Sequence, residues 1–453
     1  MKLYIVYTLL EVKVMFDTIV SLITPPLKGA VAVIRISGER TLEFVQEIFS
    51  RKIEKSHYVY YGYILNKEEK VDEVMLSYFK GPKSFTGEDV IEISCHGSML
   101  IVDQIISLLL SKGCRIAERG EFTSRAFYNG RIDLVQAEAV NSLINAQTKE
   151  AKQISLFALN GQTSSLLYPV KEHLADILSL IEVNIDYPEY EDVEEMTHDK
   201  MISELDELIE TVSNLIRDGE KSKLITEGIN VSIVGRPNVG KSSLLNALVK
   251  KEKAIVTNIP GTTRDIVEGQ ININGLIINL LDTAGIREAS DEVEKIGIER
   301  SKESIEKADL VILVLEANVL NDEDKELLEY TKNKQRVIVY NKKDLADNNS
   351  TEGIYISAKN HDIKPLENEI SKLFALDKLN SLTPSLSSSR EIGLLNKAKE
   401  ALISALEEAK MGISLDLISV NVKLAYDSIR NILGEEVKTD LSEEIFSRFC
   451  VGK

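Results

Sequence analysis

The sequence predicts a multidomain α/β protein in which a parallel-sheet domain is inserted into an all-helical domain and is preceded by an α+β domain. Residues 228–376 alternate apolar β-type runs with helical runs, which is the pattern of a parallel sheet. Residues 131–227 and 377–453 are helical in pattern and flank that block, so we expect these two stretches to pack together. Residues 15–130 alternate short β-type runs with helical runs, which indicates the α+β domain.

The elements of the first domain follow from hydrophobic periodicity. Residues 30–36 and 90–94 are β-type runs and are expected to form strands. Residues 101–110 are expected to form an apolar helix, which the pair Lys112-Gly113 ends.

The flanking helical stretches carry separate signals. A helical pattern begins at Leu134 and continues over several helices with few Gly or Pro residues. Residues 379–389 are rich in Ser and contain Pro, so they are expected to be a connector. Residues 390–447 are helical again, and the chain has no internal repeat.

Composition limits the class of protein. The length of 453 residues corresponds to about three domains, and 43% hydrophobic with 28% charged residues is typical of globular proteins. The 54 basic and 72 acidic residues give a net charge of −18, which argues against a generic polyanion binder because phosphate contacts need clustered Lys and Arg. The three cysteines form no C-x-x-C pair, so they support neither a disulfide framework nor a cysteine zinc site and fit a reducing cytoplasm.

Residues 1–14 are expected to be an N-terminal extension, and Met1 and Met15 are both candidates for the start. The apolar run 3–10 is short and lacks a small-residue cleavage site, so a signal peptide is poorly supported. No run of about 18 apolar residues occurs elsewhere, so we expect no membrane span and a cytoplasmic location.

Residues 235–242 have the pattern G-x-x-x-x-G-K-S of a phosphate-binding loop. An apolar β-type run, 229–234, precedes this loop and a helical run, 243–249, follows it. Glycines let backbone N–H groups turn toward phosphate oxygens, and the start of a helix adds a favourable dipole. Lys241 is therefore expected to reach the β- and γ-phosphates, and the Ser242 hydroxyl to hold Mg²⁺.

Two further motifs follow predicted strands. Asp282-Thr283-Ala284-Gly285 follows the run 277–281; the Asp can hold Mg²⁺ through water, and the Gly amide can approach the γ-phosphate. Asn341-Lys342-Lys343-Asp344 follows the run 337–340 and has the pattern N-K-x-D. Asp344 can accept hydrogen bonds from N1–H and the 2-amino group of guanine, a pair that adenine lacks, and Asn341 is expected to brace the loop and contact the base.

The remaining two motifs complete the nucleotide site. Ser357-Ala358-Lys359 ends the run 353–356 and is expected to present a backbone amide to the guanine O6. Within residues 261–265, Thr263 is expected to be a second hydroxyl ligand for Mg²⁺ in a switch loop. Each motif alone is a weak signal: D-T-A-G fits a turn, N-K-x-D a strand-end loop and S-A-K a helix cap. Their joint order at strand ends predicts a P-loop GTPase domain with a Ras-like parallel sheet.

The means of hydrolysis is less distinct in the sequence. Ras-type enzymes have a water-orienting Gln after D-T-A-G, whereas this chain has Ile286, which cannot form a hydrogen bond. The Asn238 amide can ligate K⁺ beside the phosphates, and the acidic stretch 288–294 can supply a carboxylate that positions water. A capping Asn and a solvated helix start explain the same residues, so both interpretations stay open.

Several short motifs outside the nucleotide site form a specific set. They are DTIV at 17–20, TPP at 24–26, IRISG at 34–38, FTGEDV at 85–90, RGEFT at 119–123, AFYNG at 126–130 and FCVGK at 449–453. Together with the segment 282–291, this set resembles the MnmE (TrmE) family of tRNA-modification GTPases, whose terminal motif has Ile where this chain has Val. Residues 1–14 have no counterpart in the family.

The resemblance implies a folate-binding N-terminal domain through which the protein forms a homodimer, a helical domain, and a GTPase domain inserted into the helical one. It also implies a flavin-dependent partner, MnmG (GidA), in a heterotetramer. The pair would add an aminomethyl or carboxymethylaminomethyl group to C5 of a tRNA wobble uridine, with the carbon supplied by a tetrahydrofolate derivative.

The resemblance also assigns residues. Arg35, Glu92 and the terminal Lys453 fall at folate-contacting positions, while Arg131 falls where a relative has Lys, and the two are not interchangeable. From the residues alone, a carboxylate suits the amide-like edge of a pteridine and a cation suits the anionic tail. Without the resemblance, however, an ordinary strand surface is the preferred interpretation of Arg35 and Glu92.

The expected catalytic residues are Lys241, at the phosphates, and Glu294, at the position of the family's catalytic carboxylate. The expected K⁺ ligands are Asn238, Thr257, Ile259 and Thr262, and the expected Mg²⁺ ligands are Ser242 and Thr263. The residues expected to contact the nucleotide and its ions are Asn238, Val239, Gly240, Lys241, Ser242, Ser243, Thr257, Asn258, Ile259, Pro260, Gly261, Thr262, Thr263, Asp282, Thr283, Ala284, Gly285, Asn341, Lys342, Asp344, Ser357, Ala358 and Lys359.

Two other functions fit part of the chain. A regulatory GTPase switch, for example in ribosome assembly, explains residues 228–376 equally well but not the motifs at both ends. A scaffold with a vestigial site fits less well, because Lys241 and Asp344 are intact. Cys450 is a reactive or a packed thiol, and His96 after Cys95 is more often structural than a metal ligand.

Overall fold

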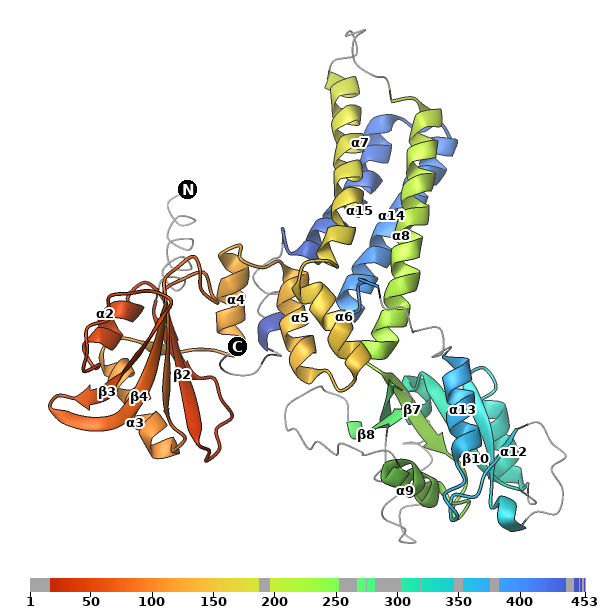
Figure 1. The fold of residues 1–453 in the computed structure, drawn as a ribbon. Coiled ribbons are helices and arrows are strands. Elements are labelled where there is room, and N and C mark those ends of the chain that lie inside the picture. Colours follow the sequence, from red (N-terminus) through yellow and green to blue (C-terminus); the bar gives the residue numbers. More distant parts are fainter. Residues whose placement is uncertain are drawn as a thin grey trace. The chain divides into compact units, whose positions relative to one another are not determined.

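The computed structural model describes residues 17–186, 196–251, 267–273, 275–281, 303–317, 320–345, 353–374, 383–436, 444–447, 449 and 452. The described chain divides into two compact units (Figure 1). The first unit contains the residues up to Asn141 and those from Arg430 onward, and the second unit contains Ser142–Ile429. Residues 430–453 therefore group with the start of the chain.

The first unit contains a six-stranded sheet. In spatial order its strands are β3 (Tyr58–Asn66), β4 (Glu69–Phe79), β5 (Val90–His96), β2 (Val31–Ser37), β1 (Ile19–Leu22) and β6 (Arg115–Ile116). Neighbouring strands are antiparallel except β1 and β6, which are parallel. The strands predicted at 30–36 and 90–94 are confirmed as β2 and β5, and they are direct neighbours.

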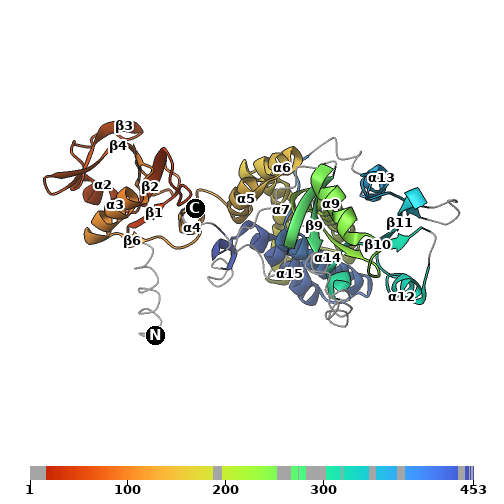
Figure 2. The ribbon, with the colours of Figure 1, turned by 90° about the horizontal axis from the view of Figure 1, so that it is seen from below.

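Two helices, α2 (Thr41–Gln46) and α3 (Met99–Ser111), cover one face of this sheet (Figures 1 and 2). Their apolar side chains share one core with alternate residues of the strands, as the period of two along a strand requires. The predicted helix 101–110 is confirmed as α3, which begins two residues earlier. It ends at Lys112 and Gly113, where the glycine has φ +110°.

The other face of the sheet leaves large apolar side chains exposed. Val31, Val59, Tyr61 and Met75 are each more than half exposed. Tyr61 and Met75 are cross-strand partners, and Val59 lies two residues before Tyr61, so these three side chains are on the same face. This set is named the open sheet face below.

The end of the chain packs onto the first unit. In α4 (Glu121–Tyr128), the ring of Phe127 lies 6.2 Å from that of Phe446, which in turn lies 5.5 Å from the ring of Phe449. A Cβ added to Gly452 would lie 2.6 Å from the carbonyl oxygen of Leu22. The last residues that the structure describes therefore lie beside strand β1.

Helices make up a large part of the second unit. They are α5 (Leu134–Asn145), which runs into the unit from the first, α6 (Lys149–Leu159), η1 (Ser164–Leu166), α7 (Tyr168–Asp186), α8 (His198–Thr226), α14 (Ser389–Lys410) and α15 (Leu415–Leu433). Helices α8 and α14 pack side by side, and Ser222 and Ser385 share a hydrogen bond of 2.6 Å between their hydroxyls. The predicted pairing of the two helical stretches is thereby confirmed. Among the described helices, none has an apolar stretch long enough to cross a membrane.

A second six-stranded sheet lies between these helical stretches in sequence. Its spatial order is β12 (Ile354–Tyr355), β11 (Arg336–Asn341), β10 (Leu310–Glu316), β7 (Ile229–Val234), β9 (Leu276–Leu281) and β8 (Val267–Ile273). All pairs are parallel except β8 with β9. The parallel sheet and its predicted strands at 229–234, 277–281, 337–340 and 353–356 are confirmed, with small shifts at the ends.

Helices cover both faces of this sheet. Helices α9 (Lys241–Lys251) and α13 (Lys364–Leu373) pack on one face, and α12 (Asp322–Tyr330) packs on the other. Strand β7 lies at the point where the strand order changes direction, with β9 on one side and β10 on the other. In doubly wound sheets, ligands bind at the carboxyl end of such a strand, which here leads into residues 235–240.

Candidate functional site

The loop between β7 and α9 has the backbone of an anion-binding loop. Gly235 and Gly240 have φ of +155° and +98°, and Asn238 between them also has a positive φ, +64°. A Cβ on Gly240 would lie 2.2 Å from Nδ2 of Asn341, so this position admits only glycine. Helix α9 begins at Lys241, which directs its free N–H groups toward the loop.

The side chain of Lys241 folds back over this loop. Its Nζ donates to the carbonyl oxygens of Gly235 at 2.6 Å and Arg236 at 2.9 Å. Burial lowers the pKa of Lys241 below its usual value. The ammonium group of Lys241 therefore lies within the loop that the sequence predicts to bind phosphates. If a phosphate bound there, its oxygens would take the place of the two carbonyl oxygens as partners of the ammonium group.

Asn341, at the end of β11, connects two loops. Its side chain is 3% exposed; Nδ2 donates to the carbonyl oxygen of Val239 at 2.8 Å, and Oδ1 accepts from the N–H of Ala358 at 3.1 Å. These two hydrogen bonds join the loop at Val239 to the turn at Ala358, while the contact of Asn341 with a base stays a prediction. The Ala358 amide, which the sequence predicts for the guanine O6, is the partner of Asn341 in this structure.

Asp344 lies on the short helix η2 (Lys343–Leu345) with an exposed carboxylate. The hydroxyl of Ser357 donates to its Oδ1 at 2.6 Å, and this hydrogen bond lowers the pKa of Asp344. Two residues that the sequence predicts at the guanine base are thus brought into direct contact. The carboxylate keeps further lone pairs for a donor pair such as the N1–H and 2-amino groups of guanine.

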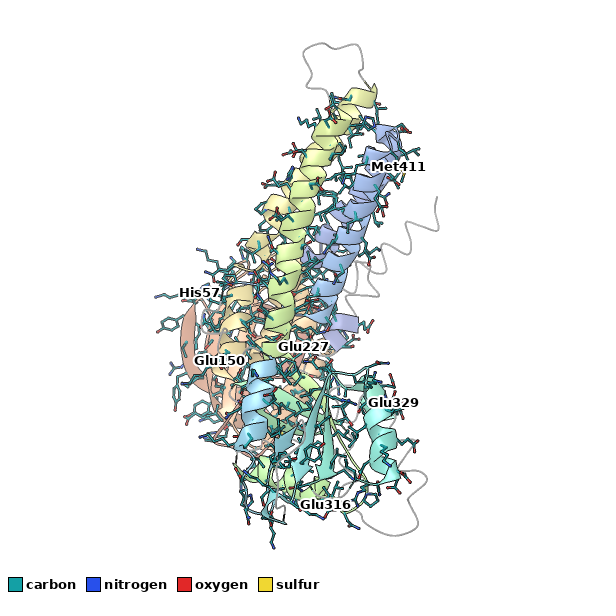
Figure 3. All side chains as sticks on the ribbon, turned by 90° about the vertical axis from the view of Figure 1, so that its right-hand side faces the viewer. His57, Glu150, Glu227, Glu316, Glu329 and Met411 are labelled. Carbon is teal, nitrogen blue, oxygen red and sulfur yellow. The ribbon has the colours of Figure 1, made fainter. Side chains whose placement is uncertain are left out.

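A charged network that the sequence analysis did not identify adjoins this loop. Glu316, at the carboxyl end of β10, accepts from Arg236 at 2.9 Å and from Nζ of Lys342 at 2.8 Å. Arg236 also bonds Asp324, a fully buried carboxylate at the start of α12, at 3.1 Å. Figure 3 labels Glu316 at the end of the sheet opposite Glu227, the residue that follows α8. The position of Glu316 at the carboxyl end of a parallel strand is the signal by which the sequence could have identified it.

Other predicted residues of this site lie outside the described residues, so their placement is not tested. They are Thr257, Asn258, Ile259, Pro260, Gly261, Thr262, Thr263, Asp282, Thr283, Ala284, Gly285 and Glu294. Among the described ones, Ser242 and Ser243 lie exposed in the first turn of α9, and Lys359 lies in the turn after β12.

A second candidate site is a cavity of about 540 Å³ in the first unit. It is lined by Arg35, His57, Phe79, Pro82, Lys83, Ser84, Phe85, Val90, Glu92 and Arg131. The structure thereby brings together three residues that the resemblance placed at folate-contacting positions, namely Arg35, Glu92 and Arg131. The fourth, Lys453, lies outside the described residues.

Arg35 and Glu92 face each other across strands β2 and β5. The Arg35 Nε and Nη2 lie 2.9 and 2.8 Å from the same Glu92 oxygen, Oε1. The guanidinium also lies 4.6 Å from the ring centre of Phe85. Its Nη1 is buried and has no hydrogen-bond partner among the described residues, and the same is true of the Ser84 hydroxyl. Two unpaired polar groups in one cavity are expected where a polar ligand binds.

The wall of this cavity at residues 82–86 is fixed from several sides. Arg131 donates through Nη1 to the carbonyl oxygen of Phe85 at 2.5 Å, and its guanidinium lies 5.2 Å from the Phe85 ring centre. The Asn129 amide donates to the carbonyl oxygen of Thr86 at 2.8 Å, and the Thr86 hydroxyl lies 2.7 Å from that of Ser37. This wall therefore has a defined shape before any ligand binds.

Beneath this wall lies a buried ionic cluster around Arg125, which is 3% exposed. Its guanidinium bonds carboxylates of Asp17 at 2.5 Å, Glu121 at 2.9 Å and Glu88 at 3.1 Å. Burial raises the pKa of Glu88, and the Arg125 charge only partly opposes it. For Asp17 and Glu121, burial alone would raise the pKa. The hydrogen bonds from Arg115 and Arg125 outweigh this effect, so the pKa of each carboxyl group lies below its usual value.

The cysteine and histidine candidates have structural surroundings. Cys95 is buried, and burial raises the pKa of its thiol to about 11. His96 contacts the Asp72 carboxylate through Nδ1 at 2.7 Å. Within the described part of the chain, no group of three or more His, Cys, Asp or Glu side chains is arranged to hold a metal ion. Cys450 lies outside the described residues.

Comparison with known proteins covers nearly the whole chain. The family model of the MnmE helical domain matches residues 134–450, and that of the GTP-binding protein TrmE N-terminus matches residues 18–131. The tRNA modification GTPase MnmE of Ligilactobacillus salivarius is 43% identical over an aligned length of 456 residues. The alignment covers 97% of this chain and 98% of that protein. The proteins of the same name from Streptococcus mutans and Bacillus licheniformis are 44% and 42% identical; they cover 97% and 96% of this chain and are covered over 99% and 100% of their own length. The chain therefore belongs to the MnmE family of tRNA modification GTPases.

Proposed function

We propose that this chain is the GTP-hydrolysing component of a system that modifies C5 of the tRNA wobble uridine, in the cytoplasm where its tRNA substrate is. The observation that carries the proposal is Asn341, which ties the phosphate loop at Val239 to the base-recognition turn at Ala358. In this arrangement, the proposed phosphate-binding loop and the proposed base-recognition turn lie at the same edge of the sheet. Family membership supports the link to tRNA.

In this proposal, the described residues have distinct roles in binding GTP. Lys241 would exchange its two carbonyl partners for β- and γ-phosphate oxygens. Asp344, held by Ser357, would accept the two guanine donors. Ser242, exposed in the first turn of α9, would hold Mg²⁺ together with Thr263, and that ion would neutralise charge on the transferred phosphoryl group.

The proposed hydrolysis mechanism relies on K⁺ and a carboxylate. Asn238 supports a cation site because its positive φ places it at the turn of the phosphate loop; the other proposed ligands are Thr257, Ile259 and Thr262. A K⁺ ion there would supply positive charge in the position of an arginine finger. Glu294 is proposed to position the attacking water, since Ile286 cannot.

The cavity of the first unit is proposed to bind a tetrahydrofolate derivative. The unpaired Arg35 Nη1 and Ser84 hydroxyl fit a ligand with polar ring atoms, and the Glu92 carboxylate fits the amide-like edge of a pteridine. The Phe85 ring offers an aromatic surface beside them. When bound, this derivative would supply the one-carbon unit, while Arg35 and Glu92 orient it and Arg131 and Lys453 hold its tail.

Two protein partners complete the proposal. The open sheet face, with Tyr61 and Met75 each more than half exposed, is the proposed contact between two copies of this chain. A flavin-dependent MnmG partner in a heterotetramer is proposed from family membership, and it would carry much of the tRNA contact because this chain has a net charge of −18. The proposed domains are 15–130 for folate and dimerisation, 131–227 with 377–453 for the helical domain, and 228–376 for GTP, with 1–14 as an extension.

The decisive test is wobble-uridine analysis of tRNA from a strain that lacks the gene. The modified nucleoside should be absent and should return with the wild-type gene but not with the Lys241→Ala variant. Unchanged nucleosides would instead favour a regulatory GTPase switch. The cavity with its unpaired polar groups counts against the switch, because a switch alone has no need for it.

A further inference from the structure

The cavity of the first unit carries more positive charge than its one carboxylate can neutralise. Its charged lining residues are Arg35, Lys83, Arg131 and Glu92. Glu92 is already paired with Arg35 at 2.8 Å. Within the described part of the chain, Lys83 and Arg131 contact no carboxylate. In a chain with a net charge of −18, two uncompensated cations at one cavity favour an anionic ligand.

The charged groups differ in depth. The Arg35 side chain is 11% exposed, and its free Nη1 is buried together with the Ser84 hydroxyl. Lys83 and Arg131 are exposed. The inner part of the cavity therefore suits the neutral polar ring atoms of a ligand, and the mouth suits its anionic groups.

The backbone that carries Lys83 is held in place. The carbonyl oxygen of Lys83 accepts from His57 Nε2 at 2.9 Å, and His57 Nδ1 lies 2.7 Å from the Ser56 hydroxyl. The Ser56 oxygen also accepts from the N–H of Lys80 at 2.9 Å, so its own proton can point to Nδ1 and leave the N–H of the imidazole on Nε2. His57 has a φ of +56°, a costly conformation for a residue with a side chain, and its ring lies edge-on to Phe79 at 5.7 Å.

We propose that Lys83 is a binding residue for the anionic tail of the ligand and that the cavity prefers folates with several glutamyl residues. The inference rests on the proposed folate function of the same cavity. Each added glutamyl residue brings one more carboxylate to the mouth, where Lys83 and Arg131 have no carboxylate partner among the described residues. Both cations are exposed, so the gain in affinity is modest and decreases with salt.

The test compares the monoglutamate and pentaglutamate forms of 5-formyltetrahydrofolate by calorimetric titration of the full chain. At low ionic strength, the pentaglutamate should bind wild-type protein about five-fold more tightly, near the upper end for an exposed ion pair. Lys83→Gln should reduce this ratio toward one, and Lys83→Arg should keep it. Lys28→Gln is the matched control, because Lys28 is also exposed but does not line the cavity.

The outcomes separate the two proposals. If the wild-type protein binds neither form, the folate function itself is wrong and the preference falls with it. If both forms bind wild type with equal affinity, or if Lys83→Gln keeps the same ratio as Lys28→Gln, the role of Lys83 is refuted while the folate function stands. Loss of the ratio in 0.5 M NaCl, with monoglutamate binding kept, would support an electrostatic contact at the mouth.

Discussion

Single side chains in the nucleotide site already have partners inside the protein. Lys241 is held by two carbonyl oxygens, Asn341 by a carbonyl and an amide, and Asp344 by the Ser357 hydroxyl. Partners of this kind reduce the entropy that is lost when a ligand binds, because the side chains are already in place. If GTP binds here as proposed, these side chains would exchange their present partners for the nucleotide.

Lys241→Ala should weaken GTP binding by about 10- to 100-fold, because a charge-assisted hydrogen bond to phosphate contributes about 1.5–3 kcal/mol. Titration with a fluorescent GTP analogue measures the change. Lys343→Ala is a suitable control, since Lys343 is exposed on η2 and the ionic contact of its side chain among the described residues is a long one, 3.9 Å from Asp362. Equal affinities of the two variants would remove Lys241 from the phosphate site.

Asp344→Asn should relax the selectivity for guanine. An amide accepts through one atom and donates through the other, so it cannot accept both guanine donors but can pair with xanthine. Competition between GTP and XTP measures this change: the preference should move toward XTP. An unchanged preference for GTP would show that another group recognises the base. Asp362→Asn, outside the base motif, should leave the preference unaltered.

At the scale of elements, functional residues lie where strands end or pair. Sequence motifs predicted Lys241, Asn341 and Asp344 because each lies within a few residues of a strand that its own apolar run reveals. Arg35 and Glu92 lie 57 residues apart and meet only through the register of β2 with β5, which periodicity does not determine. For the same reason, the contact of Arg236 with Glu316, 80 residues later in the chain, could not be predicted from the sequence.

The ionic cluster beneath the cavity wall joins Asp17, which precedes β1, to α4 and residues 86–89 through Arg125. Arg125→Met should lower the free energy of unfolding by about 3–5 kcal/mol, because three carboxylates would lose a buried counter-charge. Urea unfolding of the first unit measures the loss. Arg40→Met is the control, because its pair with Glu43 is exposed and should contribute little.

The same variant should respond to pH in a defined direction. In the wild type, the lowered pKa values of Asp17 and Glu121 mean that their stabilisation is present above about pH 4.5 and is lost as the pH falls through those values. Glu88, whose pKa is raised, gains stability on protonation and acts in the opposite sense. The deficit of Arg125→Met should therefore be largest near pH 7 and shrink below pH 3. A deficit that is constant with pH would mean that lost packing, and not charge, is the cause.

At the scale of the whole molecule, the end of the chain belongs with its beginning. Residues from Arg430 onward group with the residues up to Asn141, although the periodicity of 390–447 gives no sign of a change of unit. Periodicity reports which face of a helix is buried and not which neighbour buries it, so this grouping could not be predicted from the sequence. The order of sheets and helical stretches along the chain, in contrast, was predictable.

Phe446→Ala should destabilise the first unit by about 3 kcal/mol, because Phe446 is 4% exposed and packs between Phe127 and Phe449. Hydrogen exchange of β1 and β2 measures the effect, and GTP affinity, which belongs to the second unit, should be unchanged. Leu100→Ala is the control, because Leu100 is 68% exposed. Equal protection in both variants would argue against a stabilising role for the chain end.

The packing of Gly452 beside Leu22 has a consequence for synthesis on the ribosome. Residues 142–429, 288 in all, must be translated between the two portions of the first unit. At a synthesis rate of about 5–20 residues per second this takes about 15–60 s, during which the nascent sheet of the first unit waits for its final segment. A protein built in this way leaves its first unit incomplete for longer than folding alone would require, so a chaperone would have time to act on it.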